Sequence, residues 1–216
     1  MDLELERRYC AQHHLTIAKR ADDQPLTFEG YAAVFNTLSV SMYGFREKIA
    51  PGAFAASLGD DVRALWDHQT GMVMGRTKSN TLRLSEDATG LHFENQPPLS
   101  AAHQIESVQR GDVDQMSFGF RVLEDTWDMD GEEQIVRTLL KVKLYEVSYV
   151  TFPAYTATSA QQRSDGRQID ALYGVIPTIP KEFRRAPDSH NNPTADAAAQ
   201  VRRLLQQRRL RLLEVE

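Results

Sequence analysis

The chain has 216 residues, with 30 acidic and 25 basic side chains and a formal net charge of −5. Hydrophobic residues at 41% and charged residues at 25% exclude collagen-like, fully disordered and disulfide-scaffold proteins. No apolar run approaches the ~20 residues of a membrane helix, and the acidic total argues against non-specific DNA binding. The only cysteine, Cys10, fits a reducing compartment. These properties predict a cytoplasmic protein with neither a membrane nor a specific nucleic acid as partner.

The first 160 residues predict many short strands and few helices. In chain order, strands are expected at 27–35, 45–49, 62–68, 81–84, 91–95, 116–123 and 137–150. A helix of one to two turns is expected after Pro51, and another over 100–110, with Ser100 as N-cap and Gly111 at its end. Residues 69–71 are expected to form a loop. The pattern predicts a mainly β protein of the α+β class, an antiparallel barrel or sandwich with inserted helices.

Ser117 is the first candidate site residue. Strand side chains alternate between faces, so Met116, Phe118 and Phe120 are expected to face a core. Ser117 and Gly119 would then share the other face, where there is room for a substrate backbone to approach. The alternative is an ordinary solvent-facing serine on an edge strand.

His68 is the second candidate. The same alternation places it at the end of strand 62–68, on one face with Val62, Ala64 and Trp66. Its near-neutral titration makes it the best general base of the chain if a nucleophile lies nearby. The alternative is a structural histidine that only makes hydrogen bonds.

Glu146 is the third candidate, because it interrupts an apolar face of strand 137–150 between Leu144 and Val150. A buried carboxylate without a partner is costly, so a donor is expected. That donor is either an arginine, Arg76 or Arg121, or an imidazole that Glu146 orients. With Ser117 and His68, it would supply a nucleophile, a base and an orienting group.

Other chemistries have little support in the sequence. There is no G-x-S-x-G turn of the hydrolase type and no glycine-rich phosphate loop. One cysteine and scattered histidines give no metal-ligand spacing. We therefore expect no metal and no cofactor.

The C-terminal part differs from the rest in composition. Residues 186–199 are rich in Pro, Asn, Asp and Ala and indicate a linker. The segment from Val201 to Glu216 holds five arginines and two glutamates, so the preceding 200 residues carry a net −8. Strong helix formers over 200–216 predict a basic, imperfectly amphipathic helix, which is either docked on its own domain or contacts a partner.

Five motifs in order resemble the prohead (capsid maturation) protease family of tailed bacteriophages. They are FEGYAAVFN, REKIAPGAFAASL, VRALWDHQ followed by Gly75-Arg76, VDQMSFGF and LYEVSYVTFPAY, and they span roughly residues 15–160. The resemblance implies a serine endopeptidase with an antiparallel barrel like that of the herpesvirus assembly protease. It places the catalytic histidine on His68 and the nucleophile on Ser117. The third member is expected at Glu146, with His103 as the fallback.

The resemblance also implies a biological role. The expected substrates are the scaffolding segment of the major capsid protein and the chain itself, inside an assembling procapsid in the host bacterial cytoplasm, with a homodimer left open. The domains would be a protease at 1–165, a linker at 166–199 and a helix at 200–216. The runner-up is a non-catalytic capsid assembly or scaffolding module of the same fold, and a third alternative is an unrelated β-barrel binding module.

Overall fold

The computed structural model describes residues 5–10, 15–18, 26–39, 41, 44–131, 134–151 and 177–184. The chain divides into two units, residues 1–179 and 180–216. The described part of the second unit contains the short 3-10 helix η4 (Lys181–Phe183). The predicted C-terminal helix over 200–216 lies outside the described residues, and so do residues 186–199 of the predicted linker.

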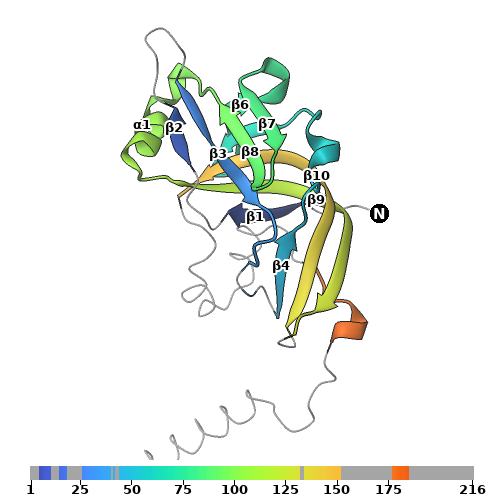
Figure 1. The fold of residues 1–216 in the computed structure, drawn as a ribbon. Helices are drawn as coiled ribbons and strands as arrows, with labels where there is room; N and C mark the ends of the chain where they lie inside the picture. Colours follow the sequence, from blue (N-terminus) through green and yellow to red (C-terminus); the bar gives the residue numbers. More distant parts are fainter. Residues whose placement is uncertain are drawn as a thin grey trace, which may run out of the picture. The chain divides into compact units, whose positions relative to one another are not determined.

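The larger sheet of the first unit is built on a long antiparallel hairpin of β9 and β10, which Figure 1 shows as two bent strands lying side by side. On the far side of β9 lies β1, and on the far side of β10 lie β5 and then β6; β4 also pairs with β10. The strands β4 and β5 run parallel to β10, whereas the other pairs are antiparallel. The bounds of these strands are β1 (Glu6–Cys10), β4 (Phe45–Ile49), β5 (Arg63–Trp66), β6 (Gln69–Arg76), β9 (Gln115–Met129) and β10 (Ile135–Val150).

The smaller sheet has the order β2-β3-β8-β7 and is antiparallel throughout. Its strands are β2 (Thr16–Ala18), β3 (Thr27–Val34), β7 (Leu82–Glu86) and β8 (Gly90–Asn95). The helical elements of this unit are short: η1 (Ala55–Ser57), η2 (Thr77–Ser79), η3 (Leu99–Ala101) and the α-helix α1 (Ala102–Arg110). None of the described helices is long and apolar enough to span a membrane.

The core lies between the two sheets. Phe28 and Phe93 of the smaller sheet pack edge-on against Tyr149 of the larger one, with ring centroids 5.9 and 6.0 Å apart. Phe118 and Phe120 of β9 belong to the same buried cluster. Because alternate residues of each strand enter this cluster, the opposite face of the β9–β10 hairpin is left for polar side chains.

The structure confirms a mainly β, α+β protein and most of the predicted strands, with several differences. Strand 62–68 ends at Trp66, and residues 69–71 begin β6 instead of forming a loop. The helix expected after Pro51 is only the 3-10 turn η1. The helix over 100–110 begins as the 3-10 turn η3, so Ser100 is not its N-cap, although Gly111 does end it with φ of 78°. The strand β1 was not predicted.

Candidate active site

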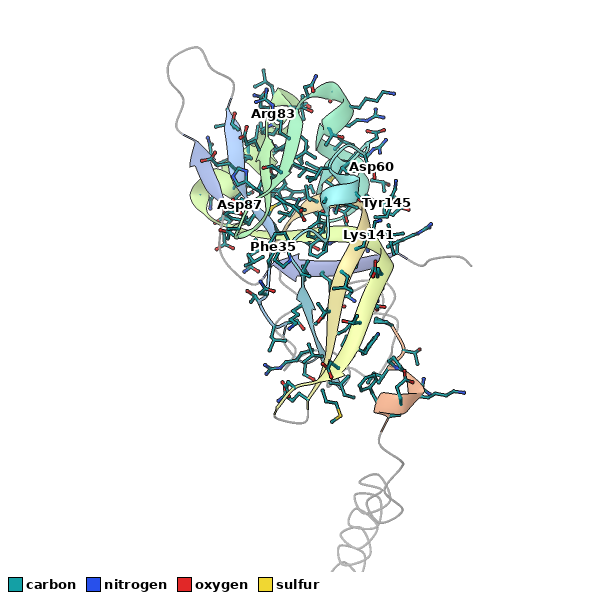
Figure 2. The ribbon with its side chains drawn as sticks, turned by 45° about the vertical axis from the view of Figure 1, so that its right-hand side comes forward. Phe35, Asp60, Arg83, Asp87, Lys141 and Tyr145 are labelled. Atoms are coloured by element: carbon teal, nitrogen blue, oxygen red, sulfur yellow. The ribbon has the colours of Figure 1, made fainter. Side chains whose placement is uncertain are left out.

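A β-bulge in β10 decides which face Glu146 occupies. Leu144 lies opposite Phe120 and Glu146 lies opposite Gly119, so Tyr145 is an extra residue without a partner on β9. The side chain of Tyr145, labelled in Figure 2, is exposed. The guanidinium of Arg121 lies over its ring. Because of this extra residue, the alternation of β10 is reversed after Leu144.

The prediction that Glu146 interrupts the apolar face of Leu144 and Val150 is therefore wrong. Beyond the bulge, Val147 and Tyr149 continue the core face. Glu146 and Ser148 face the other way, opposite Gly119 and Ser117 of β9. The bulge thus brings a carboxylate to the face of the hairpin that already carries Ser117.

His68 lies in a tight turn, not on the strand face with Val62, Ala64 and Trp66. Trp66 pairs with Gln69, so Asp67 and His68 form the two-residue loop between β5 and β6. Both have positive φ, 50° and 57°, as a type I′ hairpin turn requires. Positive φ is uncommon for residues other than glycine, and Asn, Asp and His are the residues that adopt it most readily.

The turn is tied to the end of β10 by its backbone. The amide of Asp67 donates to the carbonyl of Tyr149 at 2.8 Å. The amide of His68 donates to the hydroxyl oxygen of Ser148 at 3.3 Å. Tyr149 is itself anchored, because its hydroxyl accepts a hydrogen bond from Asn95 in the core. Burial raises the pKa of the Tyr149 hydroxyl, which keeps it a neutral partner of Asn95.

The imidazole of His68, on this tethered turn, contacts Glu146. Nδ1 of His68 lies 2.6 Å from Oε1 of Glu146, and the two side chains are only 7% and 9% exposed. When the Glu146 carboxylate is ionised it only accepts hydrogen bonds, so Nδ1 is then the donor, and Nε2 is the ring nitrogen that remains to accept a proton. Of the side chains predicted as donors to Glu146, the imidazole of His68 is the one that contacts it.

The arginines proposed as alternative partners of Glu146 are engaged elsewhere. Arg76 forms an ion pair with Asp61, and Arg121 lies over the ring of Tyr145. Arg63, directly beside Glu146 on the neighbouring strand, also bonds to Asp61. The fallback residue, His103, is exposed on α1.

Gly119 provides the space that the carboxylate fills. A methyl group added to this glycine would lie 2.3 Å from Oε1 of Glu146. The residue pattern of the strand predicts room here for a substrate backbone, whereas in the structure Glu146 fills this space. A larger residue at position 119 is therefore incompatible with the observed position of Glu146.

Ser117 lies on the same face but makes a different contact. It is 0% exposed, on a strand between β1 and β10, so it is neither solvent-facing nor on an edge strand. Its hydroxyl donates to the backbone carbonyl of Arg8 in β1 at 2.9 Å. Ser117 is the direct cross-strand neighbour of Ser148, and Ser148 in turn contacts His68 and Glu146.

Ser148 is the residue of this site that the sequence analysis missed. The available signal was a second polar side chain two residues after Glu146 in an otherwise apolar run. Among the described residues there is no group of three or more His, Cys, Asp or Glu side chains that could hold a metal ion. The site thus consists of an imidazole, a carboxylate and two hydroxyls.

Comparison with known proteins gives the family. The model of the family described as caudovirus prohead serine protease matches residues 13–171, which is more than half of the chain. The chain belongs to this family. No curated protein and no solved structure gives a significant match.

Membership in the caudovirus prohead serine protease family assigns the chain to the proteases of phage capsid maturation, which confirms the resemblance noted in its motifs. The matched range contains His68, Ser117 and Glu146. The herpesvirus-type barrel stays a prediction.

Proposed function

We propose that the chain is a serine endopeptidase of procapsid maturation in which Ser117 is the nucleophile, His68 the general base and Glu146 the residue that orients the imidazole. The observation that carries the proposal is the hydrogen bond between His68 and Glu146, on the face of the β9–β10 hairpin that Ser117 shares. The family membership supplies the reaction class, peptide-bond hydrolysis through a serine.

The proposed reaction is acyl transfer. His68 takes the proton of Ser117 on Nε2 while Oγ attacks the carbonyl carbon of the scissile peptide. The tetrahedral intermediate collapses to an acyl-enzyme, and His68 passes the proton to the leaving amine. His68 then deprotonates the water that attacks the acyl ester, and it returns this proton to Oγ of Ser117 as the acid is released. Glu146 stabilises the imidazolium that forms in each half of the cycle.

The contact of Ser117 with Arg8 defines what has to change before attack. The hydroxyl has to give up the Arg8 carbonyl and form a hydrogen bond with Nε2 of His68 instead. Because Ser117 is fully buried, the chain around it also has to open for a substrate. A requirement for opening suits a protease whose activity is confined to the assembling procapsid.

The proposed substrates are the scaffolding segment of the major capsid protein and the chain itself. The test is co-expression with the capsid protein of the same phage, comparing the unchanged chain with Ser117→Ala. Ser85→Ala, an exposed serine on β7, is the matched control. Mass spectrometry should find shortened capsid protein with the unchanged chain and the control but not with Ser117→Ala. Cleavage that persists in Ser117→Ala contradicts the serine mechanism, and no cleavage with any variant favours the non-catalytic assembly module.

Self-cleavage is tested separately by the intact mass of the chain recovered from assembly reactions. We expect loss of a C-terminal segment that includes the basic residues 201–216, dependent on Ser117. A single full-length species under conditions in which the capsid protein is cut would rule out self-removal.

A further inference from the structure

We propose that Ser148 is a positioning residue of this site, which holds the Glu146 carboxylate and the His68 backbone in one fixed arrangement. The inference rests on the proposed function, because it assigns a role within the same proteolytic site. It goes beyond the triad of Ser117, His68 and Glu146, since Ser148 contacts two of these residues and lies across from the third.

The contacts of Ser148 form a closed ring of hydrogen bonds. Its hydroxyl donates to Oε2 of Glu146 at 2.5 Å, and its oxygen accepts the backbone amide of His68 at 3.3 Å. The ring closes through Oε1 of Glu146 and Nδ1 of His68 at 2.6 Å. We call His68, Glu146 and Ser148 the imidazole cluster.

This ring of hydrogen bonds restricts both the Glu146 carboxylate and the His68 side chain. With one partner on each oxygen, the Glu146 carboxylate cannot rotate about its terminal bond without losing a charge-assisted hydrogen bond. His68 is held at its backbone by Ser148 and at its ring by Glu146. The direction of Nε2 is therefore fixed before any substrate binds, which is the preorganisation that proton transfer needs.

The same contacts argue against Ser148 as a second nucleophile. Its proton is directed at Glu146, and His68 reaches it through the backbone amide instead of the ring. Its direct neighbour on β9 is Ser117, with Cβ atoms of such pairs about 5 Å apart. Ser148 thus sits beside the proposed nucleophile with its own hydrogen-bonding capacity directed to the base.

Burial and strand pairing fix the position of Ser148. It is 0% exposed, and the bulge at Tyr145 turns it to the polar face together with Glu146. The parallel pairing of β10 with β5 places Leu65 opposite Ser148, two residues before the turn that carries His68. Removal of the hydroxyl therefore takes one hydrogen-bond partner from the Glu146 carboxylate and one from the backbone amide of His68.

The test compares Ser148→Ala with Ser57→Ala on the full chain. Ser57 is a matched control, because it is also buried and its hydroxyl also bridges two groups, the carbonyl of Val142 and the amide of Leu144 on β10. Ser148→Thr keeps a hydroxyl and serves as the rescue variant. Urea denaturation first shows which variants are folded. For each folded variant, the rate of cleavage of purified capsid precursor is measured against precursor concentration, which gives kcat and KM.

For Ser148→Ala we expect kcat to fall about tenfold to a hundredfold with little change in KM, as for other residues that orient a catalytic group. Ser148→Thr should recover most of kcat, and Ser57→Ala should lower stability while leaving kcat near that of the unchanged chain. A kcat for Ser148→Ala equal to that of Ser57→Ala would overturn the proposal. Complete loss of activity in Ser148→Ala, with a serine-directed probe bound at position 148 in the unchanged chain, would overturn it in favour of Ser148 as nucleophile.

A second readout does not depend on activity, so it separates this proposal from the proposed function. The proton between Nδ1 of His68 and Glu146 should give a far-downfield proton NMR signal in the unchanged chain. We expect the signal to persist in Ser57→Ala and Ser117→Ala and to shift or broaden in Ser148→Ala. An unaltered signal in Ser148→Ala contradicts the positioning role whether or not the chain cleaves the capsid precursor.

Discussion

The strand β10 holds two buried groups of charged side chains that differ in what they can do. Near its start, Arg137 belongs to an arginine cluster of Glu6, Arg8, Glu47 and Arg137. Near its end, Glu146 belongs to the imidazole cluster. Both are nearly inaccessible to solvent, and both join segments far apart in the chain.

In the arginine cluster, two cations face two carboxylates. Arg137 lies 2.7 Å from Glu6 and 2.9 Å from Glu47, and Arg8 lies 2.6 Å from Glu47. Burial alone would lower the pKa of Arg137, but the hydrogen bond to Glu6 and the charge of Glu47 raise it above the ordinary value. The pKa of both arginines is raised, so the two guanidinium groups of this cluster can fix structure but cannot exchange protons.

In the imidazole cluster, the arginines are replaced by an imidazole, a group that can take up and release a proton in catalysis. One carboxylate faces it, and a neutral hydroxyl occupies the second oxygen of that carboxylate. Under the proposed function, the first cluster serves the stability of the sheet and the second serves proton transfer. Substitutions should therefore separate the two properties.

The largest effect on activity is expected for His68→Asn. Asparagine tolerates positive φ, so the turn should be kept while the base is lost. We expect kcat/KM for capsid precursor to fall about 10⁴-fold, with only a modest fall in the midpoint of urea unfolding, because Glu146 loses its imidazole partner. His103→Asn, at an exposed histidine on α1, is the control. Activity within tenfold of the unchanged chain would remove His68 from the mechanism.

The largest effect on stability is expected for Arg137→Met. The change leaves Glu6 and Glu47 with fewer cations in a buried site, which should lower the free energy of unfolding by about 3–5 kcal/mol. Urea denaturation measures this, and the exposed Arg83→Met is the control. Cleavage by the folded protein at low temperature should stay near the normal rate. A loss of activity without a loss of stability would contradict the division between the clusters.

An intermediate effect on both properties is expected for Gly119→Ala. The added methyl group meets Oε1 of Glu146, so the carboxylate has to move away from His68. Overpacking of this kind costs about 1–3 kcal/mol of stability, and kcat should fall with it. Gly71→Ala, where an added methyl meets nothing within 4 Å, should change neither. Normal kcat in Gly119→Ala would show that the position of Glu146 is not critical.

The smallest effect is expected for Asp61→Asn, which breaks the exposed ion pairs with Arg76 and Arg63. The hydrogen bond from Arg76 lowers the pKa of Asp61 from 3.8 to about 2. Its contribution to stability is therefore present above about pH 4 and lost as the pH falls towards 2. The unfolding midpoint of the variant should be only slightly lower at neutral pH, because exposed ion pairs contribute little, and the two chains should become equal as the pH falls towards 2. A large loss of stability at neutral pH would contradict this ranking.

The face of Ser117 could be predicted from sequence because its strand is regular at that point. Met116, Phe118 and Phe120 mark the core face without interruption, and all three are buried as expected. The same reasoning failed for Glu146, because one extra residue, Tyr145, reverses the alternation. Tyrosine is a good strand former, so the residue at the bulge gives no local sequence signal for it.

The contact between His68 and Glu146 depends on long-range pairing. The two residues are 78 positions apart, and they meet because β5 pairs with β10 and ends in a two-residue turn. The strand β1 was missed for a similar reason. Its segment is rich in charge, and its partners are distant in the chain: it pairs along its length with β9, and Arg8 bonds to Glu47, 39 residues away. Local propensity carries no information about such partners.

The central claim, that the imidazole cluster activates Ser117, is tested most directly by a fluorophosphonate probe that reacts with activated serines. The adduct is located and its rate of formation measured by peptide mass mapping, in the unchanged chain and in His68→Asn. We expect an adduct on Ser117 in the unchanged chain and a rate lower by several orders of magnitude in His68→Asn. Reaction at another serine, or equal rates in the two chains, would contradict the account.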